Sequence, residues 1–338
     1  MVHVTARHYH LHDQYFNWFT LFLNQISRFG TPLFAVISGF LLYNSLLRGS
    51  FSTGRFIKSR LYKIVIPFLI WSFVYFWVRN YPFPWLENGK PVSEFITRFL
   101  LGDAFYHLYF IIVVLQFYLL FLLLRFAKTK EWLITLTVLS FFINYFYIGN
   151  RFEVSNEFLN AFFNHRAFIF NWIFFFFLGG LFAYYWQPVV GWLRKNVKLL
   201  AVLSIIVVVF SVYEYTEFGM YSSTRVANLF NIPVIFLFLA GMYFVLNRFE
   251  KVRSFFIHIG NLSMGIYLVH PLVLYYLTEY FPVMFYRTRW ILLTYIIAVL
   301  LSIIIVKVIH KLPFGSFIVT VASKKKAKRV PEKMKQAG

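Results

Sequence analysis

The chain has no cysteine and very little charge. Asp, Glu, Lys and Arg make up only 13% of its 338 residues, against roughly 25% in soluble domains. The missing cysteines exclude disulfides, thiolate nucleophiles and thiolate-bound metals. The low charge excludes an ordinary soluble domain.

Apolar residues fill most of the chain instead. They make up 60% of the sequence, and Phe alone occurs 46 times. A bilayer takes about 20 apolar residues to cross. We expect nine full spans plus the remnant of an N-terminal tenth, in an all-α polytopic transmembrane helix bundle. The expected spans are 27–47, 61–79, 104–126, 131–148, 167–187, 197–213, 228–246, 258–279 and 289–309. We expect one integral membrane domain over 1–312 and a basic cytoplasmic tail over 313–338.

The positions of the basic residues predict an orientation. Of 33 Lys and Arg, 23 lie on one set of alternating segments with only 3 of the 12 Asp and Glu; these segments are 48–63, 125–131, 187–198, 247–257 and 307–338. Basic residues concentrate on the cytoplasmic side of membrane proteins. We therefore expect a cytoplasmic C-terminus, an external segment at 8–26 and contact with anionic membrane lipids. Charge divided among membrane loops also argues against nucleic acid as a partner.

This orientation leaves the first helix incomplete. Span 27–47 would run inward, so a cytoplasmic N-terminus would need a further helix before it, and only MVHVTA is available. Either the N-terminus is external, or the chain begins inside a helix. His3 lies in this fragment. A neutral imidazole in a membrane helix is costly and faces the bundle interior, where it can act as a general base. The alternative is an interfacial His in a disordered start.

Two basic residues stand out at the cytoplasmic start of the second span. Arg60 and Lys63 are three residues apart, which on an α-helix places both on one face. Together they can hold phosphate groups, Arg as a planar fork and Lys as a point charge. The alternative is that both reach out to lipid headgroups.

Polar residues in two further spans indicate a cavity inside the bundle. His107 lies near the outer end of its span, and Asn261, Ser263, Tyr267 and His270 lie within ten residues of one another. Gly260, Gly265 and Pro271 would loosen this helix and free backbone groups toward the cavity. The small residues of Ser38-Gly39 and Gly179-Gly180 indicate close helix packing. Asp103 and His107 would share a helical face, but no third ligand is evident, so we expect no metal.

Four segments together resemble the bacterial membrane acyltransferase-3 family, whose members look like O-acetylases of surface glycans. LFAVISGFLL is similar to its Phe-rich Ser-Gly-Phe helix, and FIKSRLYKIVIP looks like its F-x-x-x-R-x-x-R-I-x-P segment. YHLYFIIVVLQFYLL is similar to its H-x-W-F/Y-L helix, and IGNLSMGIYLVHPLV to its G-x-x-S-x-x-I-Y-L-x-H segment. The matches follow the family's order and cover most of the chain.

The resemblance implies roles for particular residues. Family members open with a helix carrying an Arg and, about ten residues later, a His proposed as the catalytic base; this assigns the base to His3. The family Arg has no counterpart here, which implies that the first half of the first helix is lacking, as a misassigned start codon would cause. The resemblance assigns donor binding to Arg60 and Lys63, with Lys63 where the family has Arg. Ser38, His107, Asn261, Ser263, Tyr267 and His270 become candidates for lining the acceptor cavity.

The resemblance also implies an activity and a location. An acyl group, acetyl in the first place, would move from acyl-CoA as co-substrate to a hydroxyl of a glycan or lipid-linked glycan at the bacterial cell membrane. The alternative is a polysaccharide exporter of the intercellular-adhesion type, which also resembles this family. Transporters typically show paired repeats with broken helices, and the sequence shows no such repeat. A purely structural scaffold would leave the buried His and the basic pair without a purpose.

Overall fold

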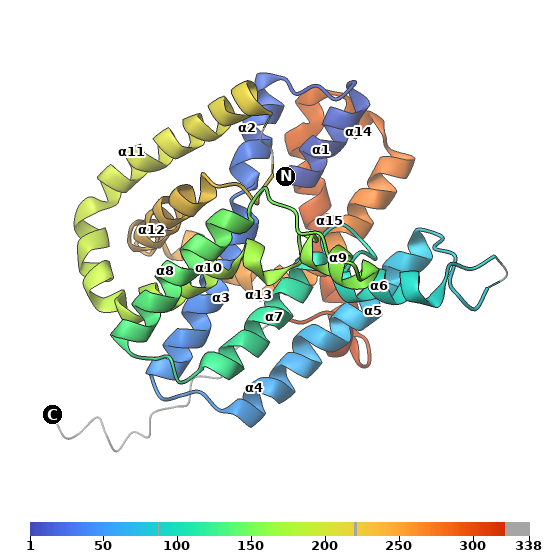
Figure 1. Cartoon of the computed structure of the whole chain (residues 1–338). Coiled ribbons are helices and arrows are strands. Elements are labelled where there is room, and N and C mark those ends of the chain that lie inside the picture. Colours follow the sequence, from blue (N-terminus) through green and yellow to red (C-terminus); the bar gives the residue numbers. More distant parts are fainter. Residues whose placement is uncertain (87, 220–221, 322–338) are drawn as a thin grey trace, which may run out of the picture.

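A computed structural model describes residues 1–86, 88–219 and 222–321, and within them the chain is helical without strands (Figure 1). The first half contains α1 (Val2–Leu11), α2 (Trp18–Ser27), α3 (Gly30–Leu47), α4 (Thr53–Arg60), the π-helical turn η1 (Leu61–Val65), α5 (Ile66–Val78), α6 (Val92–Leu101), α7 (Tyr109–Leu124) and α8 (Lys130–Tyr147). The second half contains α9 (Glu157–Phe163), η2 (Ile169–Asn171), α10 (Ile173–Tyr184), α11 (Trp186–Phe218), α12 (Asn228–Leu246), α13 (Glu250–Tyr280), α14 (Val283–Tyr286), η3 (Thr288–Trp290), α15 (Ile291–Lys311) and α16 (Gly315–Ile318).

The protein is a polytopic membrane helix bundle, as the composition predicts. In the described part, six helical runs are long and apolar enough to cross a bilayer, and α7 and α10 are shorter apolar helices. Each of the nine expected spans contains a helix, although several boundaries differ. The first run begins at Trp18 rather than residue 27, and α10 begins at Ile173 rather than residue 167. The 33-residue α11 extends beyond 197–213 at both ends, with a kink at Asn196.

The centre of the bundle is the contact between α3 and α10. A side chain on Gly39 would collide with the backbone carbonyl of Phe176, and one on Gly179 with that of Val36. The two backbones therefore touch through glycines, the close approach that small residues allow in membranes. Phe117 stacks on Phe176, with ring centroids 4.6 Å apart, and so joins α7 to this pair.

A second core joins α1, α5, α7, α13 and α15. Figure 1 shows α1 rising from the middle of the bundle to its upper edge, next to α14 and α15. Adjacent residues on α7 belong to different cores: Phe110 packs into the α3–α10 core and Ile111 into the second core. Because α7 joins both cores, the residues that begin it are held at the centre of the molecule.

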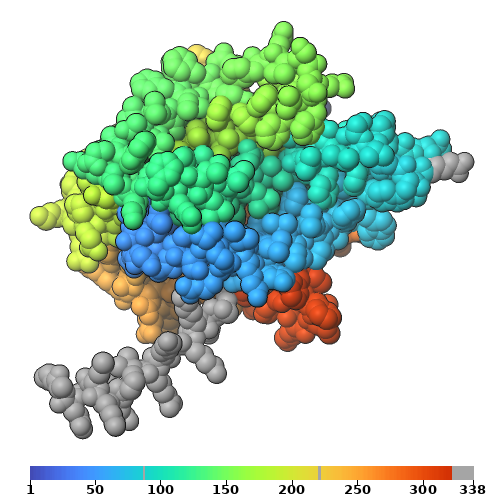
Figure 2. Space-filling view, turned by 60° about the horizontal axis from the view of Figure 1, so that its bottom comes forward, coloured from blue at the N-terminus to red at the C-terminus, as the bar shows by residue number. Residues whose placement is uncertain are grey.

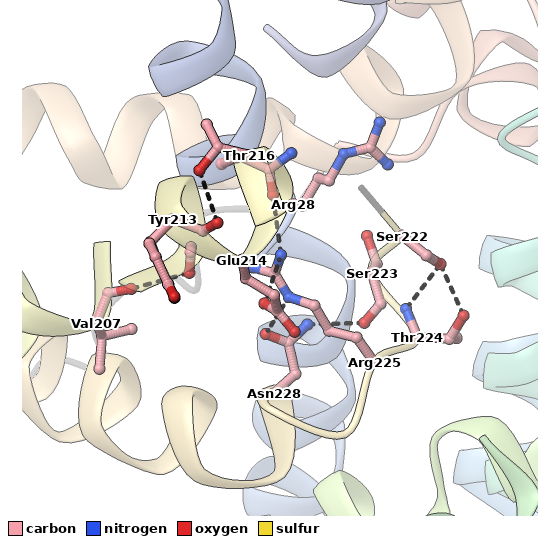
Figure 3. Close-up of polar contacts among 12 residues, drawn as sticks. Arg28, Val207, Tyr213, Glu214, Thr216, Ser222, Ser223, Thr224, Arg225 and Asn228 are labelled. Carbon is pink, nitrogen blue, oxygen red and sulfur yellow. Dashed lines mark hydrogen bonds and ion pairs between the residues drawn. The ribbon is translucent and has the colours of Figure 1, made fainter. Parts of the chain in front are cut away.

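Helices α11 and α12 form a wing at the left of Figure 1, and this wing contacts α2 through the packing of α11 and through a hydrogen bond from the buried Arg225. Figure 3 shows Arg225, from the loop after α11, between Glu214 and Asn228. Arg225 Nη1 lies 3.2 Å from Glu214 Oε2 and 2.9 Å from Gln25 Oε1 on α2, and the Arg225 side chain is 1% exposed. Outside the spanning segments, burial lowers the pKa of Arg225 while Glu214 opposes that shift, and the close carboxylate keeps the guanidinium charged.

The segment after α15 folds back onto α5. Trp71 Nε1 donates to the carbonyl of Ile318 at 2.9 Å, and Thr320 Oγ1 donates to the carbonyl of Lys63 at 2.7 Å. In Figure 2 this red segment lies at the lower edge of the molecule, next to the blue surface of the first third of the chain. The expected tail over 313–338 thus starts with nine residues, 313–321, that contact the bundle, and its remainder lies outside the described residues.

Candidate functional site

Helix α1 is held so that His3 faces the interior of the second core. At its outer end His8 Nδ1 lies 2.8 Å from the Phe285 carbonyl, and Asn24 on α2 donates to Thr5 Oγ1 at 2.9 Å. His3 lies at the opposite end of this ten-residue helix, with its ring 4.2 Å from the ring of Tyr106. Contacts on both sides therefore fix the depth and rotation of α1.

His270 faces His3 from α13, with ring centroids 5.8 Å apart. Its Nδ1 lies 3.0 Å from the Ile266 carbonyl. A carbonyl can only accept, so a neutral His270 carries its proton on Nδ1 and keeps a free lone pair on Nε2. The orientation of this second ring nitrogen is therefore set by the helix itself.

Pro271 follows His270 without breaking α13, because Tyr75 replaces the missing backbone contacts. The Tyr75 hydroxyl donates to the Leu268 carbonyl at 2.6 Å and accepts from the Leu272 amide at 3.2 Å. A side chain inserted into the helix ladder is a recognised cause of local distortion. The expectation that Pro271 frees backbone groups for a cavity is therefore corrected at these two groups, because Tyr75 satisfies them.

His107 completes a cluster of three histidines, which we call the histidine cluster: His3, His107 and His270. The ring of His107 lies 5.7 Å from that of His270 and is only 4% exposed. Among the described residues neither of its ring nitrogens has a hydrogen-bond partner. The Tyr267 hydroxyl donates a hydrogen bond to the His107 carbonyl, and the Tyr267 ring lies 5.1 Å from the His107 ring. A buried, unsatisfied imidazole is expensive unless a substrate supplies the missing partner.

Two cavities approach the histidine cluster from opposite ends of the bundle. The outer cavity, of about 400 Å³, is lined by His3 and Tyr106 and by the polar residues Arg7, His10 and Glu279. The inner cavity, of about 170 Å³, opens near the cytoplasmic loops of the expected orientation and is lined by Ser38, Ile64, Phe110, Ile111, Tyr118, Ser263 and Tyr267, among others. Tyr267 lines this cavity and its ring lies 5.1 Å from that of His107, so the inner cavity ends next to His107. The histidine cluster thus separates the two cavities.

Arg60 and Lys63 lie near the inner cavity, next to its lining residues Tyr118 and Ile64, but they do not share a face. Residues 61–65 form a π-helical turn, in which the Ile66 amide donates to the Leu61 carbonyl. Pro67 explains this turn, because it cannot donate and displaces the carbonyl four residues earlier, that of Lys63. The Arg60 guanidinium lies over the ring of Tyr118, at 4.8 Å, whereas Lys63 is exposed. The prediction of a shared face, made for an α-helix, was wrong.

The remaining sequence-predicted residues divide between the site and its surroundings. Ser38, Ser263 and Tyr267 line the inner cavity. The other three residues expected to line a cavity line neither of the two: His107, Asn261 and His270. Residues 102–108 are turns rather than helix, so Asp103 and His107 share no helical face. Asp103 instead contacts His165 at 3.2 Å. Burial by itself would raise the pKa of Asp103, but the hydrogen bond and charge of His165 lower it overall. Across the described ranges, no group of three or more His, Asp or Glu could hold a metal.

Sequence reasoning missed several residues that shape the site. Tyr75 and Tyr106 are ordinary aromatics in an aromatic-rich chain, and nothing in the sequence distinguishes them. Arg28 is different, because it is the single charged residue between Trp18 and Leu47. Its Nε donates to Asn24 Oδ1 at 2.7 Å, and Asn24 in turn contacts α1 through Thr5. A lone charge inside an apolar run is a functional signal in membrane helices.

Comparison with known proteins identifies the family of this chain. The sequence matches the acyltransferase-3 family, described as an acyltransferase domain, over residues 1–310. The chain belongs to the acyltransferase-3 family. This makes it a multi-pass membrane acyltransferase of that family, and its histidine cluster lies within the matched residues. No solved structure matches it.

Two curated relatives within the family carry the name "probable poly-beta-1,6-N-acetyl-D-glucosamine export protein". The protein from Staphylococcus aureus strain MSSA476 is 25% identical over 265 residues, which cover 75% of this chain and 71% of the relative. The Staphylococcus epidermidis protein is 26% identical over 270 residues, covering 75% and 70%. These names place the family members they describe in a polysaccharide context.

Proposed function

We propose that this protein transfers an acyl group, acetyl in the first place, from cytoplasmic acyl-CoA to a hydroxyl of a glycan at the outer side of the cell membrane. The observation that carries the proposal is the position of His3, which lines the outer cavity and has its ring 5.8 Å from that of His270. A base at that position can serve an acceptor from one side while the donor arrives from the other.

The proposed reaction has one acyl transfer step. His3 takes the proton of the acceptor hydroxyl, and the hydroxyl oxygen attacks the thioester carbonyl. The carbon–sulfur bond breaks, an ester forms, and coenzyme A leaves as a thiolate that takes up a proton. Positioned acid–base groups of this kind contribute about 10²- to 10⁴-fold to rate. Among the described residues no carboxylate contacts His3, so no negative charge keeps its imidazole protonated.

Donor binding is assigned to the cytoplasmic end of the inner cavity. Arg60, over Tyr118, and the exposed Lys63 flank that end and supply positive charge for the phosphates of coenzyme A. The acyl thioester would extend through the inner cavity past Ser38 and Ser263. The proposal includes this donor assignment and a cytoplasmic C-terminus. It also includes a glycan acceptor that is either free or linked to a lipid.

The test is acetyl transfer by purified full chain in proteoliposomes, with acetyl-CoA as donor and a β-1,6-linked N-acetylglucosamine oligosaccharide as acceptor. We expect His3→Ala to lower kcat at least 100-fold. The matched control is His258→Ala, which removes an exposed His from α13 and should leave kcat unchanged. Elution of each variant as a monodisperse peak checks folding. Unchanged transfer by folded His3→Ala would contradict the base assignment.

The relatives' name favours a second candidate, polysaccharide export. An exporter must pass a polymer across the membrane, whereas here the histidine cluster separates two cavities of about 400 and 170 Å³. Cells lacking the protein distinguish the two functions. Glycan that reaches the surface without acyl groups supports the transferase, and glycan retained inside supports the exporter.

A further inference from the structure

Three features place His107 where a proton is needed on the donor side of the reaction. Its ring is buried, neither ring nitrogen has a partner among the described residues, and its ring lies 5.1 Å from that of Tyr267, which lines the inner cavity. A carbonyl, hydroxyl or carboxylate usually satisfies such an imidazole. A thioester sulfur arriving through the inner cavity would be the missing partner.

The leaving group of the reaction needs a proton near this position. A thiolate leaving into a water-excluded layer is costly, because a charge there has no solvent to stabilise it. Protonation of the sulfur as the carbon–sulfur bond breaks removes that cost. His3 cannot supply the proton directly from the outer cavity, because His270 lies between: its ring is 5.8 Å from that of His3 and 5.7 Å from that of His107.

We propose that His107 is the acid that protonates the coenzyme A sulfur, and that His270 passes to it the proton that His3 removes from the acceptor hydroxyl. The inference rests on the proposed acyl transfer. His270 Nδ1 donates to the Ile266 carbonyl, so Nε2 alone takes up the proton from His3 and releases it, and one bridging water at Nε2 carries it on to His107. The reaction is balanced, because one O–H and one C–S bond break while one C–O and one S–H bond form.

Tyr75 and Tyr267 hold this chain of imidazoles in place. Tyr75 bridges the α13 backbone immediately around His270, at Leu268 and Leu272, and its ring lies 5.1 Å from that of His107. Tyr267 bonds the His107 carbonyl and lines the inner cavity. These tyrosines are positioning residues, since they act on the histidines rather than on the reacting atoms.

The test compares His107→Gln and His270→Gln with the exposed control His258→Gln, in proteoliposomes with acetyl-CoA and the same oligosaccharide. Gln keeps polar atoms at each position but cannot carry the proton. We expect kcat to fall at least 30-fold in both cluster variants, with KM for acetyl-CoA within twofold of wild type. Proton transfer then limits the rate, so the solvent deuterium isotope effect on kcat should exceed that of wild type, which a merely structural defect would not cause.

A second variant keeps the proposal open to refutation if a Gln variant does not fold. His107→Gly leaves space for a diffusible proton donor, and added imidazole should restore its transfer rate at least tenfold without affecting His258→Gln. Folded Gln variants with kcat within twofold of wild type would overturn the relay. So would a failure of imidazole to restore folded His107→Gly. If wild type itself transfers no acetyl group, the proposed function fails, and the relay fails with it.

Discussion

Arg225 is charged, almost fully covered and held by partners from three segments. Its contacts are Glu214 on α11, Gln25 on α2 and Asn228 on α12. Removing one partner of a buried pair leaves an uncompensated charge, which costs about 3–5 kcal/mol. The Arg225 guanidinium therefore joins α11, α12 and α2 at one buried point.

The residue-scale prediction follows from this pair. We expect Glu214→Gln to lower the thermal unfolding midpoint in detergent by several degrees, because Arg225 loses its counter-charge. The control Glu217→Gln, on the exposed side of the same helix, should leave the midpoint within a degree. Adding Arg225→Met to Glu214→Gln should recover part of the loss. Equal midpoints for the Glu214 and Glu217 variants would show that the pair contributes nothing.

Sequence reasoning located the site residues whose types are uncommon in apolar spans. His3, His107 and His270 are uncommon in apolar spans, and the structure brings all three together. Tyr106 and Tyr75 were not located, because aromatic residues make up 23% of the chain and carry no signal there. Arg60 and Lys63 were located, but their relative direction was wrong, since Pro67 changes the helix type between them.

At the scale of elements, apolar length located the spans but not their ends. Helix α10 starts late because the residues before it form the turn η2, where Gln116 on α7 contacts the backbone at both Ala167 and Ile169. Helix α11 continues past both ends of its apolar run, since tertiary packing and not hydropathy decides where a helix stops. Neither effect is visible from the local sequence.

The element-scale prediction concerns the contact between α3 and α10. We expect Gly39→Ala and Gly179→Ala each to destabilise the protein, because the added methyl group meets backbone carbonyls that cannot move independently; overpacking of this kind costs about 1–3 kcal/mol. Gly191→Ala on α11 is the matched control, as nothing lies within 4 Å of its added Cβ. It should stabilise the helix by up to about 1 kcal/mol.

Thermal unfolding in detergent distinguishes the destabilisation expected for Gly39→Ala and Gly179→Ala from the stabilisation expected for Gly191→Ala. Midpoints that fall for the two α3–α10 variants and rise or hold for Gly191→Ala would agree with the close approach. A Gly39→Ala variant as stable as Gly191→Ala would mean that α3 and α10 lie further apart than described.

At the scale of the whole molecule, the distribution of charge predicts which face is cytoplasmic. The chain has no cysteine, so single cysteines can be introduced without a background. We expect Ser50→Cys, between α3 and α4, to react with a membrane-impermeant maleimide only after the cells are opened. Asn156→Cys, at the start of α9, should react in intact cells. The reverse pattern would invert the orientation and separate the inner cavity from cytoplasmic acyl-CoA.

The two cavities on either side of the histidine cluster have a consequence for the energy of the reaction. In the proposed scheme, a proton moves from a hydroxyl at the outer cavity to a sulfur at the inner cavity while the acyl group moves the opposite way. The ester has the charge of the hydroxyl it replaces, and the thiol has the charge of the thioester, so a membrane potential of about 2.3 kcal/mol per elementary charge per 100 mV has no net charge to act on. Acyl transfer through this bundle would therefore be electroneutral, and the voltage of an energised cell would leave its equilibrium unchanged.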